Sequence, residues 1–145
     1  MSFTTSLFNN INCIYILKSM QRRIIFIDFI SYFFDDYFVI TDQIPEQISD
    51  ADATEILKRY LESYDQSDDQ SQWFDKIRTI AEDMGYAAKP KDYKKHPEEY
   101  KGHVGHVSTV IRLAVAGRSQ SPDIWEIQQI LGEEKTRQRV EMLIG

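Results

Sequence analysis

Apolar residues recur at the three- and four-residue spacing of amphipathic helices through most of the chain after residue 50. This pattern predicts helices at about residues 52–64, 71–84, 104–116, 121–131 and 133–144. No segment alternates apolar and polar residues between turn signals, so we expect no strands. With a further apolar stretch before residue 40, the prediction is an all-α fold, a compact array of five or six helices.

Residues with known capping preferences mark the expected ends of these helices. Asp52 and Glu55 have the spacing of a capping box, and Ser71 is a plausible N-cap for the following helix. The run Ser121-Pro122-Asp123 combines an N-cap hydroxyl, a proline at the first helical position and an acid in the first turn. Three glycines are expected to end helices: Gly85, Gly117 and Gly132.

Residues 86–101 interrupt the helical pattern. They contain two prolines, five lysines and three tyrosines, which predicts an exposed, ordered connection.

The first forty residues are rich in isoleucine and aromatic residues. The apolar run from Ile24 to Phe34 is eleven residues long and contains Asp28, whereas a membrane span needs about twenty apolar residues. We therefore expect a buried helix and no membrane anchor. The start of the chain has neither the basic residues nor the cleavage site of a secretory signal. A helix this aromatic needs a partner surface, either in this chain or in another.

Charge is distributed unevenly along the 145 residues, whose formal net charge is -6. Residues 42–83 carry a balance of -8, whereas residues 84–118 carry +4. The whole-chain value argues against a protein that coats nucleic acid, but it hides a basic stretch. From charge alone, the simpler interpretation is that the protein has two oppositely charged faces that are only solvated and bind no partner.

Several kinds of catalytic and metal site are not supported by the sequence. The single cysteine, Cys13, excludes an internal disulfide framework and a cysteine-based zinc finger, and favours a reducing compartment such as the cytoplasm. His103-Val104-Gly105-His106 resembles an ATP-binding signature of class I aminoacyl-tRNA synthetases, but no strand precedes it, so we interpret it as coincidence. A metal site at His103 and His106 would need a third ligand, such as His96, Glu98 or Glu99; surface histidines beside lysines are the favoured interpretation.

A binding surface is the remaining possibility. Lysines alternate with tyrosines between residues 89 and 101, a pattern suited to phosphates and unpaired bases. Arg112 can pair with phosphate or stack on a base, and the start of the 121–131 helix would offer free backbone N–H groups beside Ser121. The alternative is that Arg112 extends along the surface and Ser121 merely caps its helix.

The segment from Arg112 to Glu134 carries a family resemblance. It contains Arg-Leu-Ala-Val-Ala-Gly, then Ser-Pro-Asp-Ile-Trp-Glu, then Leu-Gly-Glu-Glu. In this order and spacing the motifs resemble the C-terminal anticodon-binding domain of bacterial glutamyl-tRNA synthetases. The likeness covers roughly residues 28–144, and residues 86–102 resemble a branch found in certain Gram-positive and anaerobic bacteria.

The resemblance implies an α-helical cage that receives anticodon bases of the tRNA for glutamate. Arg112 would pack against a base, in a pocket lined by Ser121, Pro122 and Ile124. Gln120 and Trp125 would lie at the edge of that pocket. The basic stretch would supply phosphate contacts from Lys94, Lys95 and Lys101. Asp123 stands where a small residue is common in the family, which argues against phosphate contact at that position.

The resemblance also implies what this chain would not do alone. The family's catalytic domain, which uses ATP, has no counterpart here, so we expect no cofactor in this chain and no activity by itself. Residues 1–27 do not look like the family, and we expect residues 28–145 to form the anticodon-binding domain. There are two alternatives. One is a truncated or inert remnant of a synthetase. The other is a helical protein-interaction module that binds a separate catalytic half, or a second copy of itself, through its aromatic N-terminus. Acceptance of the tRNA for glutamine stays open.

Overall fold

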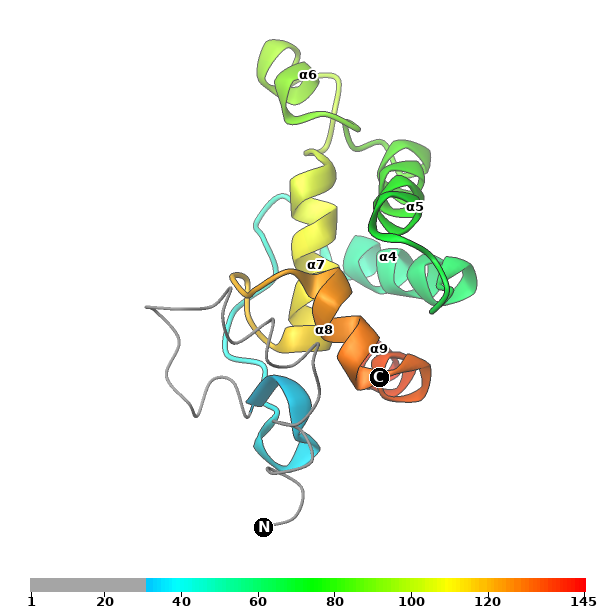
Figure 1. Ribbon diagram of the computed structural model, residues 1–145. Coiled ribbons are helices and arrows are strands. Elements are labelled where there is room, and N and C mark those ends of the chain that lie inside the picture. The colour runs from blue at the N-terminus through cyan, green and yellow to red at the C-terminus, as the bar shows by residue number, and fades with distance from the viewer. Residues whose placement is uncertain (1–30) are drawn as a thin grey trace.

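The computed structural model describes residues 31–145 of the chain (Figure 1). Over this range residues 31–33 are helical, and one 3-10 helix and six α-helices follow. Their bounds are η1 Asp35–Tyr37, α4 Asp50–Ser63, α5 Gln70–Asp83, α6 Pro90–Lys95, α7 Val104–Ala116, α8 Ile124–Leu131 and α9 Glu133–Ile144. The predicted all-α array is confirmed, since residues 31–145 contain only one isolated bridge, between Ala87 and His103, and no strand.

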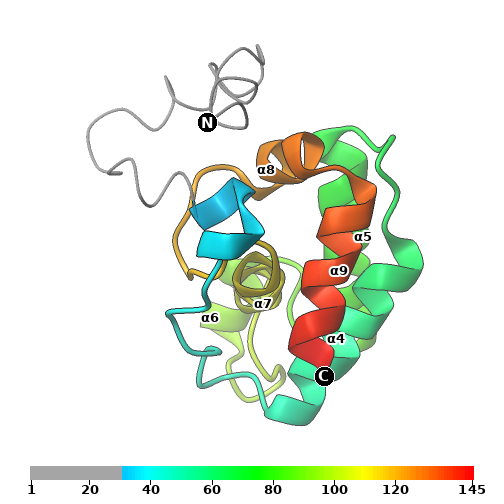
Figure 2. The ribbon, with the colours of Figure 1, turned by 90° about the horizontal axis from the view of Figure 1, so that it is seen from below.

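Helix α7 is the central element of the core. Seen along its axis, it has α4, α5 and α9 on one side and the segment that follows residue 31 on the other (Figure 2). Its expected apolar side, Val107, Val110, Ile111 and Ala114, is completely buried. Leu113, Val115 and Ala116 on other sides of α7 are buried as well, and only a narrow polar side that includes Ser108 and Arg112 stays partly exposed.

The first two N-caps differ from those expected. The N-cap of α4 is Ser49, whose side chain accepts a hydrogen bond from the backbone N–H of Asp52 at 3.1 Å. The N-cap of α5 is Asp69, which forms a reciprocal capping box with Gln72. The predictions of Asp52 and Ser71 in these roles were wrong, because the N-caps lie three and two residues earlier, at side chains that reach the free N–H groups. The predicted stops at Gly85, Gly117 and Gly132 are confirmed, each with positive φ.

A buried tyrosine links three helices. The Tyr60 hydroxyl on α4 accepts a hydrogen bond from Trp73 Nε1 on α5 at 2.9 Å and another from Gln128 Nε2 on α8. Burial raises the pKa of Tyr60 well above its usual value, so the phenol stays neutral. The polar contact fixes the relative positions of α4, α5 and α8 within an otherwise apolar core.

Arg139 ties the segment near residue 32 to the rest of the fold. The side chain is 2 % exposed although it lies on α9, a helix with a mostly polar sequence. Its Nη1 donates hydrogen bonds to the carbonyl oxygens of Tyr32 and Val115, and its Nη2 donates to Asp35 Oδ1 at 3.1 Å. The guanidinium also lies over the Phe38 ring, 4.2 Å from its centroid. A single arginine therefore joins α9, the end of α7 and residues 32–38.

The segment 86–101 is more structured than an exposed connection. It contains α6, and Tyr86 and Ala87 are almost fully buried. The Tyr86 hydroxyl donates to Asp52 Oδ2 at 2.7 Å, and the backbone N–H of Lys101 donates to the Gly85 carbonyl at 3.1 Å. The prediction of exposure was thus wrong for the start of the segment, which the structure holds against α4.

The expected buried helix at Ile24–Phe34 falls mostly outside the described residues. The part that is described is residues 31–34, of which 31–33 are helical and buried and Phe34 is half-buried. Across residues 31–145, none of the helices has the length and apolar character needed to cross a membrane.

Candidate nucleic-acid interface

A surface pocket of about 420 Å³ lies where α5, α7 and the start of α8 meet. Its lining residues are Gln70, Ser71, Trp73, Phe74, Ser108, Arg112, Asp123 and Ile124. Three of these residues, Trp73, Phe74 and Ile124, are aromatic or aliphatic, and the other five are polar or charged. A mixed lining of this kind can contact the face of a flat ligand through its apolar side chains and the edge of that ligand through its polar groups.

Arg112 on α7 is half-buried and is held by the loop before α8. Its Nη1 donates to the Ser121 carbonyl and to Ser121 Oγ, both at 2.9 Å, and to the Pro122 carbonyl at 3.3 Å. Within residues 31–145, the other two guanidinium nitrogens, Nε and Nη2, have no hydrogen-bond partner. Burial lowers the pKa of Arg112, but an arginine remains charged under such conditions. One edge of the guanidinium is therefore fixed, and the rest remains available to the pocket.

The start of α8 differs from the expectation that Ser121 caps it. The N-cap is Asp123, whose Oδ1 accepts from the backbone N–H groups of Trp125 at 2.9 Å and Glu126 at 3.3 Å. Its Oδ2 accepts a hydrogen bond from Gln70 Nε2 of α5. Because this carboxylate occupies the helix N-terminus, the expected free N–H groups for an anion are absent there. Ser121 instead supports Arg112, and its hydroxyl donates to the Pro122 carbonyl at 2.8 Å.

The structure brings together only part of the predicted base pocket. Ile124 is buried and lines the pocket, as Arg112 does, and Ser121 and Pro122 lie directly behind the guanidinium. Trp125 turns away, since its indole N–H donates to the Asp68 carbonyl at 3.1 Å. Gln120 is exposed in the preceding loop.

Other lining residues were missed by the sequence analysis. Ser108 lies one helical turn before Arg112, and Gln70 and Phe74 are also one turn apart on α5. Residues four apart share a helix face, so the spacing from Arg112 is a signal that could have identified Ser108. No such local signal relates the α5 residues to α7, because that relation depends on the packing of the two helices.

The predicted lysine contacts do not all belong to one surface. Lys94 and Lys95 are exposed in the last turn of α6. Lys101 instead pairs with Asp52 Oδ2 at 3.1 Å and lies 5.8 Å above the Tyr86 ring. In Figure 1 α6 lies beyond the first turn of α7, whereas α8 lies beside the later turns. The α6 lysines are therefore separate from the Arg112 pocket.

The two histidines of the His-Val-Gly-His sequence form the N-terminal cap of α7. His103 Nδ1 accepts from the Gly105 N–H at 2.9 Å, and His106 Nδ1 accepts from the His103 N–H at 3.1 Å. Their ring centroids are 4.0 Å apart, and the Tyr93 ring packs against both. The interpretation as surface histidines was wrong, because both rings are half-buried and both Nδ1 atoms are used as hydrogen-bond acceptors.

Acid should weaken this cap. Burial, and then the nearby charge of Lys94, lower the pKa of His103; burial, and then His103 itself, lower that of His106. The unfolded chain, with histidine pKa values near ~6.5, therefore binds protons more readily than the folded one. The cap's contribution to the free energy of unfolding is complete above that pH and is lost as the pH falls below it. We expect a loss on the order of 1 kcal/mol, measured by urea unfolding between neutral pH and about pH 5.

Two variants assign this loss to the cap. His103→Asn keeps an acceptor at the N-cap but does not titrate, so it should reduce the acid-dependent loss. His96→Asn, at an exposed position outside the cap, should leave the loss unchanged. An identical pH dependence in wild type and His103→Asn would contradict the assignment.

These features define a class of protein: an all-α binding domain with an arginine-lined pocket at a helix junction. Comparison with known families makes this specific, because the model of the anticodon binding domain matches residues 17–144. The chain belongs to this family. The match confirms the resemblance seen in the sequence and does not favour an interaction module or an inert remnant. The expected boundary after residue 27 stays a prediction.

Similar proteins include several bacterial glutamate–tRNA ligases. The one from Acetivibrio thermocellus is 63 % identical over 117 residues, which cover 81 % of this chain and 21 % of the relative. Those from Sorangium cellulosum and Clostridium perfringens strain 13 are 40 % and 38 % identical over 75 % and 77 % of this chain. The chain thus spans about a fifth of the length of these relatives. No solved structure matches it significantly.

Proposed function

We propose that this chain binds the anticodon loop of the tRNA for glutamate, with one base entering the Arg112 pocket. The observation that carries the proposal is the half-fixed guanidinium of a residue that lines the pocket: Nη1 is held by Ser121 and Pro122, while Nε and Nη2 make no hydrogen bond within residues 31–145. A planar cation positioned in this way can stack on a base or donate to its edge with little loss of side-chain entropy.

The electrostatics of the pocket favour a base over a phosphate. Asp123 lines the pocket with an exposed carboxylate, and Glu126 lies in the first turn of α8, which Asp123 caps. Burial, and then the charge of Asp123, raise the pKa of Glu126, so the Asp123 carboxylate disfavours a further negative charge nearby. A phosphate would be repelled, whereas the uncharged face of a base would meet Phe74, Ile124 and the Arg112 guanidinium.

The other predicted contacts have distinct roles in the proposal. Ile124 provides an apolar wall, whereas Gln120 and Trp125 lie along the path of the RNA near the pocket. Lys94 and Lys95 are free to approach phosphates of the stem, which adds affinity that depends on salt but not on sequence. Lys101 would take part only if it leaves Asp52.

The proposal extends to the whole protein. This domain would act in the cytoplasm as the tRNA-selecting part of a glutamate–tRNA ligase. ATP and glutamate would be handled by a catalytic domain outside this chain, so the chain would need no cofactor of its own. The names of the relatives support glutamate specificity; binding of the tRNA for glutamine is a separate outcome of the same assay.

The test is an electrophoretic shift assay with the tRNA for glutamate at two salt concentrations. Arg112→Ala should weaken binding roughly tenfold, the equivalent of one lost base contact. Arg112→Lys, which keeps the charge but not the planar group, should recover only part of the affinity. The matched control is Arg59→Ala on α4. Arg59 Nε lies 2.7 Å from Glu55 Oε1, and neither residue lines the pocket.

Two results would overturn the assignment. One is a tRNA affinity unaffected by Arg112→Ala. The other is equal weakening by Arg59→Ala, which would indicate a general loss of charge. Because Arg112 also holds residues 121 and 122, the thermal stability of each variant is measured in parallel, and binding is compared only below the unfolding transition.

A further inference from the structure

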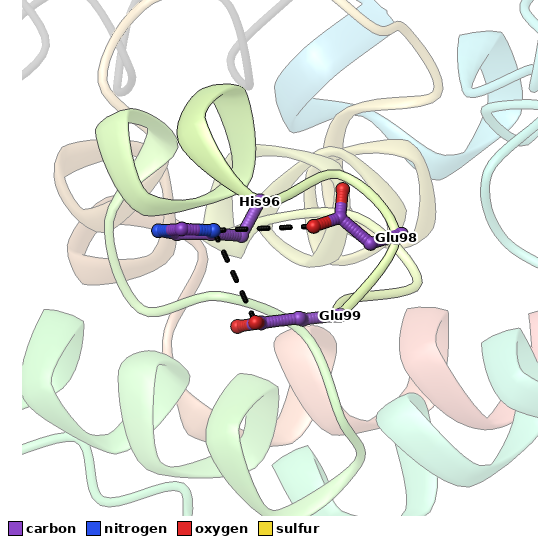
Figure 3. Close-up of side chains that lie close together, drawn as sticks. All are labelled: His96, Glu98 and Glu99. Atoms are coloured by element: carbon purple, nitrogen blue, oxygen red, sulfur yellow. Dashed lines mark ion pairs between the residues drawn. The ribbon is translucent and has the colours of Figure 1, made fainter.

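The tight turn after α6 places one imidazole beside two carboxylates. His96, Glu98 and Glu99 are close together in Figure 3, with one nitrogen of the imidazole directed toward both acids. His96 Nδ1 lies 3.9 Å from Glu98 Oε1 and 3.9 Å from Glu99 Oε1. The three ligand atoms all lie within 4.8 Å of one another, so they surround a common point.

The backbone fixes this arrangement. The Glu99 N–H donates to the His96 carbonyl at 3.0 Å, which closes a four-residue turn with Pro97 at its second position. Proline has a fixed φ that suits this position, so the turn is largely preformed. The His96 N–H donates to the Asp92 carbonyl at 3.0 Å and joins the turn to α6. Only side-chain rotations remain for the three groups to reach a ligand.

The distances suit a small cation. A point equidistant from the three atoms lies about 2.5 Å or less from each of them, and zinc–ligand bonds to histidine and carboxylate are about 2.0–2.2 Å. A movement of about half an ångström by exposed side chains closes this difference. An imidazole with two carboxylates suits zinc and similar transition metals, whereas magnesium and calcium prefer oxygen ligands only.

We infer that His96, Glu98 and Glu99 form a binding site for a divalent transition metal of the zinc type, with water completing its coordination. His103 and His106 do not belong to this group of ligand atoms, and their Nδ1 atoms accept backbone hydrogen bonds in the α7 cap. All three ligands are exposed, and Lys94 and Lys95 lie close by in sequence, so the affinity is micromolar rather than that of a structural zinc site. The inference does not depend on RNA binding.

The test uses the full chain with Cys13→Ser, which removes a competing thiol, and Zn²⁺ as the only added ligand. Calorimetry should give one equivalent of bound metal, and NMR should show the His96 imidazole signals shifting while those of His103 and His106 stay in place. The double variant Glu98→Gln/Glu99→Gln should weaken binding at least tenfold. His96→Asn provides an independent removal of the nitrogen ligand. Magnesium at the same concentration should not shift the His96 signals.

The matched control is Glu133→Gln/Glu134→Gln, a pair of exposed neighbouring acids at the start of α9. It should leave Zn²⁺ binding unchanged. The inference is overturned if zinc shifts the signals of His103 or His106 instead of His96. It is also overturned if the two double variants weaken binding equally, which would indicate diffuse attraction to negative charge.

Discussion

Arg139→Met is expected to lower the free energy of unfolding by about 3 kcal/mol, which corresponds to roughly 10 °C in Tm for a domain of this size. Methionine preserves much of the apolar volume but removes the hydrogen bonds to the Tyr32 and Val115 carbonyl oxygens, which lie in the interior. It also removes the ion pair with Asp35 and the cation above the Phe38 ring. Buried carbonyls without donors account for most of the loss.

The effect should be local as well as global. Residues 32–38 are held to α7 and α9 through this guanidinium, so their amide hydrogens should exchange faster in the variant than those of α4 and α5. Chemical denaturation combined with hydrogen exchange measures both effects. The control is Arg78→Met on α5, where an exposed arginine pairs with Asp75 at 2.7 Å, and the expected change is below about 0.5 kcal/mol. Equal destabilisation by the two variants would contradict the role assigned to Arg139.

Gly117→Ala should destabilise the protein by about 3 kcal/mol or more. Gly117 ends α7 with φ +78°, a conformation that costs a side-chain-bearing residue about 1 kcal/mol. In addition, an added Cβ would lie 2.1 Å from the carbonyl oxygen of Val39, well inside van der Waals contact. Because that neighbour is backbone, residues 38–41 would have to move, and the hydrogen bond from Thr41 N–H to the Gly117 carbonyl would be lost.

Gly85→Ala separates the two contributions to this cost. Gly85 has a similar φ, +85°, at the end of α5, but the nearest atom to an added Cβ is Lys101 Cε at 3.8 Å, which is ordinary van der Waals contact. It should therefore show only the conformational cost of about 1 kcal/mol. Urea unfolding of both variants gives the comparison. If their losses are equal, the close approach of Val39 to Gly117 has no energetic consequence.

Local sequence signals determined the helices of this domain. The three- and four-residue periodicity of α4, α5 and α7 depends only on which side chains share a helix face, so the buried positions Ile56, Ile77 and Val110 could be predicted. The glycines that end helices were also predictable, because a positive φ is a property of a single residue. The family resemblance in residues 112–134 is likewise local, because it rests on short motifs that follow one another in a fixed order.

The helix starts were harder to predict. Several polar residues near each start can act as N-cap, and the choice depends on a turn of backbone that the periodicity does not define. At α8 the choice also depends on other helices: Arg112 of α7 binds Ser121, and Gln70 of α5 binds Asp123. Sequence therefore placed an N-cap in the right region, and packing decided which side chain had the role.

What the sequence alone determined is the helical class, the core faces and the arginine on which the proposed site depends. Only the tertiary structure decided that Arg139 is buried, that His103 and His106 cap α7, and that α5 completes the Arg112 pocket. The physical reason is the range of the interactions. Periodicity and glycine geometry act within a few residues, whereas the carbonyls that receive Arg139 come from segments far apart in the chain and meet only after the helices pack.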